Sequence, residues 1–286
     1  MKILKLCVLW IIACIAFTAA GQSASGVEYR FQSDTSQLAH ANSMFQVGEE
    51  LEYSVHYSIF NIGTIRFKVT DMEERDGRTI YHAYAFMDSN PSLSWLVDMH
   101  IRFYSEIDQN AYTYGWISDD SSGDGVKYRR MRFDYANHKM YYEWGKKAAS
   151  DERKAQGVDT IAIDTASQDG LSLFYYARAH ALQKNNDHIP TFIDTNKAVT
   201  NINFLDEASD MEIDAVNYPI DVVRIDGRAD FVGIFGLTGG FEGWFSNDAA
   251  CVPVKARLKV ILGSIRVELT KWKRSDWVPQ KAMVKN

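Results

Sequence analysis

The stretch SQDGLSLFYYARAHALQ, residues 167–183, is the one clearly helical segment in a chain whose other patterned segments indicate strands. Ser167 is expected to cap this helix, and Asp169 falls in its first turn, where the helix dipole favours a negative charge. When this segment is drawn as a helical wheel with 3.6 residues per turn, apolar side chains occupy nearly the whole circumference of the helix. A helix of this kind is buried. In an otherwise β chain, the surface available to bury it is a curved sheet.

The rest of the chain alternates apolar and polar residues with a period of two, as Leu51, Tyr53 and Val55 illustrate. This alternation predicts strands with one buried face. Asn61-Ile62-Gly63 and Asp76-Gly77 are typical turns between hairpin strands. Later segments with strand character are residues 100–107, 112–117, 126–135, 140–144, 191–204, 218–232, 241–246, 252–262 and 264–272. A sheet of ~10 strands or more must curl or close to protect its edges.

Two segments interrupt the alternation. Residues 90–98 contain a proline near their start and closely spaced apolar residues, which predicts a short helical excursion. Residues 146–156 are polar and charged, and we expect a loop there. The predicted fold class is mainly β, a large curved antiparallel sheet or partly closed barrel wrapped over one buried α-helix.

The first residues carry a targeting signal. Lys2 and Lys5 precede an apolar core at residues 6–17, and small residues follow. This order predicts a signal peptide at residues 1–20, because the core is shorter than the ~20 residues that span a membrane. Cleavage there gives a periplasmic or secreted bacterial protein without a transmembrane span, although acylation at Cys14 would instead give a lipoprotein. The expected organisation is a flexible lead-in at 21–42, a single β-rich domain at 43–275 and a C-terminal tail at 276–286.

Cysteine content and charge narrow the function classes. Removal of the signal peptide leaves Cys251 as the sole cysteine, so no intramolecular disulfide can form. A buried inert thiol and a reactive thiol are the two interpretations of Cys251. The net charge is −6, and it becomes −8 without Lys2 and Lys5, with 29 basic residues against 37 acidic. Such a charge disfavours a nucleic-acid partner, since nucleic-acid binding relies on a basic surface.

Motifs for metal and phosphate chemistry are missing. The seven histidines lack metal-ligand spacing, so we expect neither a metal nor another cofactor. Residues 120–125 copy the first half of a calcium loop, but position twelve is Met131, and a hairpin turn is the better interpretation. Glycoside cleavage needs two carboxyl groups ~5 to 9 Å apart. The first candidates for such a pair are the acids that flank the break in the strands, Asp88, Asp98, Glu106 and Asp108.

Arg178 is the most informative single residue, because it projects from the helix face that also carries Phe174 and Tyr175. A guanidinium buried there without a partner would cost several kcal/mol. One interpretation is a buried ion pair with a sheet carboxylate that locks the helix in place. The other is an anion anchor in an apolar cavity, which receives a lipid or acyl head group. With Trp95 and Trp116 as further lining, these residues form the predicted ligand-binding set.

Three stretches carry a resemblance to a known family. They are FQVGEELEYSVHYSIFNIGTIRFKV at 45–69, DGLSLFYYAR at 169–178 and GWFSNDAACVPVKARLKVILGSI at 243–265. In order and spacing they resemble the exported bacterial proteins grouped as domain of unknown function 3108. The resemblance implies a mostly antiparallel β envelope domain and supplies no catalytic residues. Residues 247–250 depart from the family, which more often has acidic and basic residues there.

These observations favour a non-enzymatic periplasmic protein that binds an apolar or amphipathic envelope component in a groove between sheet and helix. Its expected partner is a lipid or lipoprotein-like ligand. The architecture is also similar to lipoprotein and lipid carriers of the envelope, although fold alone does not determine function. A structural or interaction protein with a filled core and an envelope protein partner is the alternative, followed by a carbohydrate-active enzyme.

Overall fold

The computed structural model describes residues 44–95, 98–232, 237–260, 263–275 and 277–283. The predicted signal peptide, the lead-in and the alternative acylation site at Cys14 lie outside these residues. In the described part of the chain, fourteen strands form one antiparallel sheet. The strands are β1 (Glu50–Tyr57), β2 (Phe60–Arg75), β3 (Arg78–Ser89), β4 (His100–Asp108), β5 (Thr113–Asp120), β6 (Val126–Asp134), β7 (Lys139–Lys147), β8 (Arg153–Ala162), β9 (Asn185–Ile193), β10 (Asn196–Met211), β11 (Ile220–Val232), β12 (Leu237–Ser246), β13 (Pro253–Val260) and β14 (Ser264–Lys273).

The chain enters this sheet in the middle. The strand order is β8-β7-β6-β5-β4-β3-β2-β1-β14-β13-β12-β11-β10-β9, so β1 lies between β2 and β14. The first eight strands lead outward to one edge, and the last six lead back from the other edge. β1 and β14 pair from Glu50 opposite Lys273 to Tyr57 opposite Ile265, and this pairing joins the two halves.

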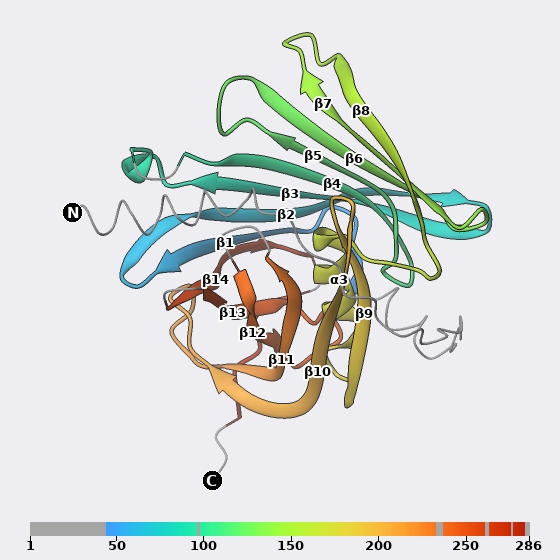
Figure 1. Ribbon diagram of the computed structural model, residues 1–286. Helices are drawn as coiled ribbons and strands as arrows, with labels where there is room; N and C mark the ends of the chain where they lie inside the picture. The colour runs from blue at the N-terminus through green and yellow to red at the C-terminus, as the bar shows by residue number, and fades with distance from the viewer. Residues whose placement is uncertain (1–43, 96–97, 233–236, 261–262, 276, 284–286) are drawn as a thin grey trace.

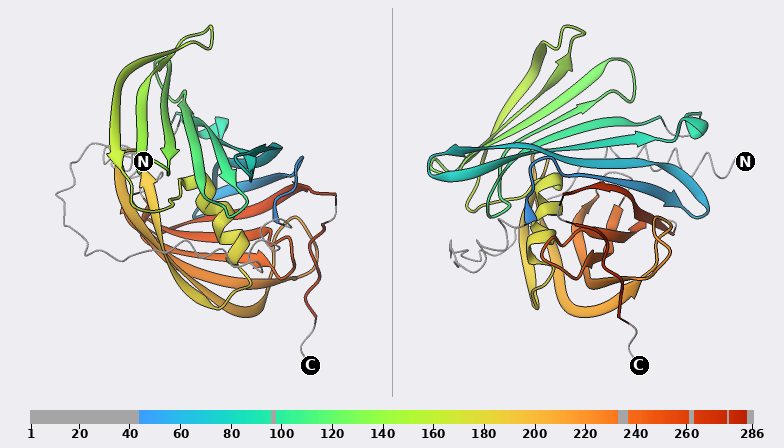
Figure 2. Two further views of the ribbon diagram at one scale, coloured as in Figure 1. Left: turned by 90° about the vertical axis from the view of Figure 1, so that its right-hand side faces the viewer. Right: turned by 180° about the vertical axis from the view of Figure 1, so that it is seen from behind.

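The sheet bends strongly but does not close. Strands β9–β14 curl into a barrel-like half, and β4–β8 extend away from it as a twisted wing (Figure 1). The helix α3 (Gly170–His180) lies next to β9 and below the wing in Figure 1 and in the view from behind in Figure 2. The predicted fold class, a curved antiparallel sheet wrapped over one helix, is confirmed.

The helix begins later than the sequence indicated, because its cap is Asp169 and not Ser167. The Asp169 carboxylate accepts from the backbone N–H groups of Leu171 and Ser172, and the Ser172 hydroxyl accepts from the Asp169 N–H. The preceding residue, Gln168, cannot be helical because its backbone bridges β9 at Thr191. The predicted range of 167–183 is therefore too long at both ends.

Packing of α3 against both halves of the sheet confirms that it is buried. Leu171 and Tyr175 belong to a core cluster formed mainly by β2–β7, whereas Ala177 packs in a second cluster with β9–β12. Phe174 stacks on Phe67 of β2 with ring centroids 4.0 Å apart. It also contacts a third cluster, formed by β1, β11, β13 and β14. One helix therefore contributes to three core clusters.

Three expectations about local structure need correction. Residues 191–204 are not one strand, because Asp194 adopts a left-handed conformation (φ 53°) and turns β9 into β10. Residues 146–156 are not a loop throughout, since they contain the end of β7 and the start of β8. Strand β8 is an edge strand with solvent on both faces over much of its length, so it lacks the alternation that marks a half-buried strand.

The two remaining irregular segments agree better with expectation. The excursion at 90–98 contains the short 3-10 helix Pro91–Leu93, capped by Asn90, while residues 96–97 lie outside the described part. Residues 121–125 form the turn between β5 and β6 that the hairpin interpretation predicted.

Candidate functional site

Arg178 holds the helix to the start of the first strand through a buried ion pair. Its guanidinium donates to both carboxylate oxygens of Glu49, Nη1 to Oε1 at 2.6 Å and Nη2 to Oε2 at 2.9 Å. Nη2 also donates to the carbonyl oxygen of Ala250 at 3.1 Å. Glu49 directly precedes β1 and is as buried as Arg178. This is the ion-pair interpretation of Arg178, with its guanidinium engaged by protein groups.

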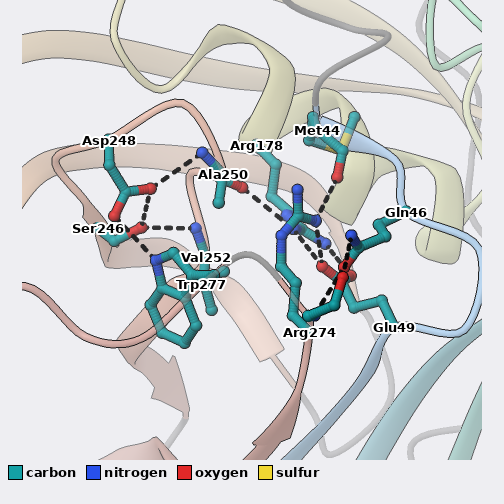
Figure 3. Close-up of polar contacts among 11 residues, drawn as sticks. Met44, Gln46, Glu49, Arg178, Ser246, Asp248, Ala250, Val252, Arg274 and Trp277 are labelled. Carbon is teal, nitrogen blue, oxygen red and sulfur yellow. Dashed lines mark hydrogen bonds and ion pairs between the residues drawn. The ribbon is translucent and has the colours of Figure 1, made fainter.

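A second arginine shares the same carboxylate. Arg274, just beyond β14, donates from Nη1 to Oε2 of Glu49 at 2.6 Å and to the carbonyl oxygen of Met44 at 2.9 Å (Figure 3). Burial alone would raise the pKa of Glu49, but the two guanidinium groups outweigh it and lower that pKa. Glu49, Arg178 and Arg274 form what we call the charge cluster. Its net formal charge is +1.

The turn between β12 and β13 supports the charge cluster from one side. One carboxylate oxygen of Asp248 accepts from the Ser246 hydroxyl and from the Ala250 N–H, both at 2.9 Å. Its other oxygen accepts from the indole N–H of Trp277 at 2.8 Å. These bonds present the Ala250 carbonyl to Arg178 and attach the C-terminal segment to the turn (Figure 3). Asp248 thus has a structural role in this turn.

An open pocket lies beside the charge cluster, where the segment before β1 meets the segment after β14. Its volume is about 440 Å³. The lining consists of Gln46, Val47, Gly48, Trp272, Lys273, Arg274, Ser275, Trp277 and Val278. Gln46 and Ser275 fix the two segments together, since the Gln46 amide donates to the Ser275 hydroxyl and accepts from its N–H. Arg274 belongs to both the pocket and the charge cluster.

The lining of the pocket is amphipathic. Val47 and Val278 are 46% and 59% exposed at its rim, and the Trp272 and Trp277 rings meet edge to face at 5.8 Å. Lys273 and Arg274 contribute positive charge, and no carboxylate lines the pocket among the described residues. The arrangement suits an apolar chain that ends in an anionic group.

The structure places the residues of the predicted ligand-binding set in different environments. Phe174 and Tyr175 flank Arg178, whose guanidinium carbon lies 5.8 and 5.5 Å from their ring centroids. Tyr175 also stacks on Phe45 at 4.9 Å. Trp116 is buried in the cluster that contains Tyr175, where it packs on Phe103. Trp95 is 58% exposed, follows the 3-10 helix in sequence and does not belong to the core cluster that contains Tyr175.

Sequence analysis missed Glu49, Arg274 and the pocket. Arg178 and Arg274 are separated from Glu49 by 129 and 225 positions, so no local spacing connects the three residues. The signal that could have found them is the conflict of Arg178 with its apolar surroundings, which requires a buried acid somewhere in the chain. The sequence alone does not show which of the 37 acidic residues pairs with Arg178.

The other candidate groups are engaged in structural contacts. Asp88 accepts from Arg102 at 2.7 Å, and Glu106 forms an ion pair with Arg75. Burial raises the pKa of the Cys251 thiol to about 12, and its Sγ lies 3.2 Å from the Asp248 carbonyl oxygen. In the described residues, no group of three or more metal-ligating side chains is placed to hold an ion. No helix there has the length and apolar character needed to cross a bilayer.

Comparison with known proteins identifies the family. The family described as "Protein of unknown function (DUF3108)" matches residues 52–270. The chain belongs to DUF3108. The match begins within β1 and ends within β14, so it contains α3 and all the strands between them, while Glu49 and Arg274 of the charge cluster lie just outside it. No curated protein matches the sequence.

One solved structure supports the fold of this DUF3108 chain. A β-barrel-like protein of domain of unknown function DUF1849 from Brucella abortus superposes with a TM-score of 0.53 at 8% identity. The match covers 81% of this chain and 99% of that one. A Bacteroides fragilis protein with a YmcC-like fold has a TM-score of 0.32 at 9% identity, over 80% of this chain and 97% of that one. At such identities the first likeness concerns the fold alone.

Proposed function

We propose that this protein is a non-enzymatic binding protein of the bacterial cell envelope that takes up an amphipathic ligand with an acyl chain and an anionic head group. The binding site is the open pocket beside the charge cluster. This assignment moves the ligand from the groove between sheet and helix, where Phe174 and Tyr175 already pack on other rings.

The observation that carries the proposal is the pocket's combination of size and lining. A volume of about 440 Å³ lies in the range of known small-molecule sites, roughly 300 to 1,000 Å³. Val47, Val278 and the two tryptophans offer apolar contact to an acyl chain. Tryptophan is especially suited to this contact because its ring is largely apolar and its N–H can bond elsewhere. The Trp277 N–H does so, with Asp248.

The charge cluster supports an anionic head group. Two buried arginines share the carboxylate of Glu49, and Arg274 also lines the pocket. The positive charge of the Arg274 guanidinium would attract an anion in the pocket. Lys273 at the rim, exposed to water, would attract the same group. A purely apolar ligand would have no favourable electrostatic interaction with either Arg274 or Lys273.

Binding of oleate, measured by quenching of tryptophan fluorescence with a brominated analogue, tests the proposal. We expect wild-type protein to bind oleate more tightly than oleyl alcohol, which has the same chain without the charge. The double substitution Val47→Asp, Val278→Asp should weaken oleate binding at least about tenfold, because each valine that a ligand covers contributes on the order of 1.5 kcal/mol or more. Both positions are exposed, so folding should be unaffected.

The matched control is Val158→Asp, which changes a valine 72% exposed on the edge strand β8, away from the pocket. This variant should bind oleate like the wild type. Native mass spectrometry of protein purified from its own envelope should show a bound lipid. Protein that carries no lipid and binds neither oleate nor phosphatidylglycerol would contradict the proposal and favour a structural or interaction protein, for which the packed core around α3 provides independent support.

A further inference from the structure

Exposed apolar side chains gather at one end of the sheet, in the turn between β1 and β2. Ile59 is 84% exposed and Phe60 is 50% exposed. Ser58 adopts a left-handed conformation (φ 55°) that makes the turn tight, and both apolar residues directly follow it. Large apolar side chains that are exposed next to each other mark a surface that a partner can cover.

A third exposed aromatic residue lies on the adjacent segment. Trp95 is 58% exposed and follows the 3-10 helix Pro91–Leu93. Asn90 ties this segment to the beginning of β2, since its side chain donates to the Asn61 carbonyl oxygen and its N–H donates to the Ile62 carbonyl oxygen, both at 2.9 Å. The 3-10 helix and the β1–β2 turn lie at the same end of the sheet in Figure 1 and in the opposite view of Figure 2.

Positive charge flanks the turn on the other side. Arg266 of β14 is exposed and pairs in register with His56, one residue before the end of β1. Lys259 of β13 is exposed beside the turn that leads into β14. Within the part of the chain that the structure describes, neither cation has a carboxylate at ion-pair distance. Their charges are therefore available to an external anion.

The same region contains a cross-strand arrangement that costs stability. Arg257 lies directly opposite Arg266 in the β13–β14 ladder. Like charges in this position repel each other. Only Arg257 has an acidic partner, Glu242 at 3.2 Å. An anionic surface that approached from outside would relieve this repulsion.

We propose that this end of the sheet, with Ile59, Phe60 and Trp95 as apolar contacts and Lys259 and Arg266 as cations, docks onto the surface of an anionic phospholipid membrane. Trp and Phe with flanking cations are the side chains that favour the membrane interface. Each Lys or Arg near an anionic lipid surface strengthens binding by about fivefold. The contact would bring the protein to the lipid layer that contains the ligand class proposed above.

This surface is distinct from the pocket. The pocket lies before the first residue of β1 and the turn lies after its last, so the eight-residue strand separates them by roughly 26 Å. The two proposals therefore fail or succeed separately, and different variants test them. Val47→Asp, Val278→Asp should lose oleate binding and keep membrane binding.

Flotation with vesicles tests the membrane contact. We expect the wild type to bind vesicles of phosphatidylethanolamine and phosphatidylglycerol at low ionic strength, and to bind pure phosphatidylcholine vesicles much more weakly. Ile59→Ser, Phe60→Ser should reduce binding to the anionic vesicles at least about tenfold through lost apolar contact. Lys259→Gln, Arg266→Gln should reduce it about 30-fold, and about 1 M salt should have a similar effect on the wild type.

The control is Met72→Ser, because Met72 is 57% exposed on β2 well away from the β1–β2 turn. This variant should bind as the wild type does, and circular dichroism should show that all variants are folded. The proposal is overturned if the wild type does not bind the anionic vesicles, or if the Ile59→Ser, Phe60→Ser variant binds them equally well. A concentration-dependent dimer in place of vesicle binding would also overturn it, and would assign the surface to a second copy of the chain.

Discussion

Asp108 illustrates at the scale of one residue how burial changes the chemistry of a carboxyl group. Its side chain is almost fully buried at the end of β4. One oxygen accepts from the N–H groups of Asn110 and Tyr112, both at 2.9 Å, and the other lies 3.7 Å from Arg78. Burial raises the pKa of Asp108 to about 6, although these contacts act in the opposite direction. Asp108 was a candidate because it lies near the break in the strand pattern. The sequence does not show which groups surround its carboxyl group in the folded protein.

Asp108→Asn should change how stability depends on pH. The folded wild type holds the Asp108 proton more tightly than the unfolded chain, so its free energy of unfolding falls as pH rises from about 4 to above 6. The asparagine oxygen can still accept both N–H groups but does not titrate. We expect the stability of the variant relative to the wild type to increase by about 2 kcal/mol between pH 4 and pH 7.

Urea unfolding at pH 4, 5, 6 and 7 measures this difference, since Asp108→Asn removes a single titrating group. A difference between the two proteins that stays constant over the series would show that Asp108 has the same pKa in the folded and unfolded chain. Asp134→Asn is a suitable comparison. The pKa of Asp134 is lowered, chiefly through its hydrogen bonds with Asn137, so any effect of that substitution has the opposite sign.

At the scale of an element, α3 depends on a cap that is entirely buried. The Asp169 carboxylate accepts from two backbone N–H groups, from the Thr113 hydroxyl at 2.8 Å and from the Ser105 hydroxyl at 3.1 Å. Thr113 and Ser105 belong to β5 and β4, so the cap also attaches the helix to the wing of the sheet. The sequence predicted a capped helix here, but only tertiary contacts decide which polar residue forms the cap.

Asp169→Ala should therefore destabilise the protein more than an ordinary cap substitution. Loss of a solvent-exposed cap costs about 1 kcal/mol, whereas this change leaves two N–H groups and two hydroxyls in the interior without their acceptor, at about 1 to 3 kcal/mol each where no water replaces it. We expect a loss of at least about 3 kcal/mol in urea unfolding, and a smaller loss for Asp169→Asn, which keeps one acceptor. Equal stability of Asp169→Ala and the wild type would contradict a role in attachment.

Predictability differed between kinds of element for a physical reason. Strands with one buried face were predicted because burial imposes a period of two, as in β1 with its buried Leu51, Tyr53 and Val55. Strand β8 was missed because neither of its faces is consistently covered. The break between β9 and β10 was missed because the turn contains no glycine or proline, and Asp194 itself takes the left-handed conformation.

At the scale of the whole molecule, the two halves of the sheet pack against the same helix. α3 packs against β2–β7 with one face and against β9–β12 with another, and the charge cluster joins positions near both ends of the described chain. The curved sheet and its buried helix could be predicted because the spacing of apolar residues along the chain depends on which side chains are buried. The candidate site could not, because it arises where distant segments meet and neither segment shows a pattern of its own.

We therefore expect the β-rich domain to unfold as a single cooperative unit. Tryptophan fluorescence, far-UV and near-UV circular dichroism should give the same midpoint during urea unfolding, which is the usual test for two-state behaviour. Trp116 in the wing and Trp277 beside the barrel-like half report on the two regions. Two separate transitions would show that the β1–β8 and β9–β14 regions are independent bodies.

The pairing of β1 with β14 has a consequence for how the chain is made. During synthesis, β1 leaves the ribosome more than 200 residues before β14, the strand that completes its backbone hydrogen bonding. Until that strand emerges, the apolar inner surface of the early hairpins and the free edge of β1 are open to other chains, which is the condition that favours aggregation. Pairing across so long a separation is also slow, since the ends of a long loop must first meet. We therefore expect a polypeptide with this strand order to be prone to aggregation until its last strand has been synthesised.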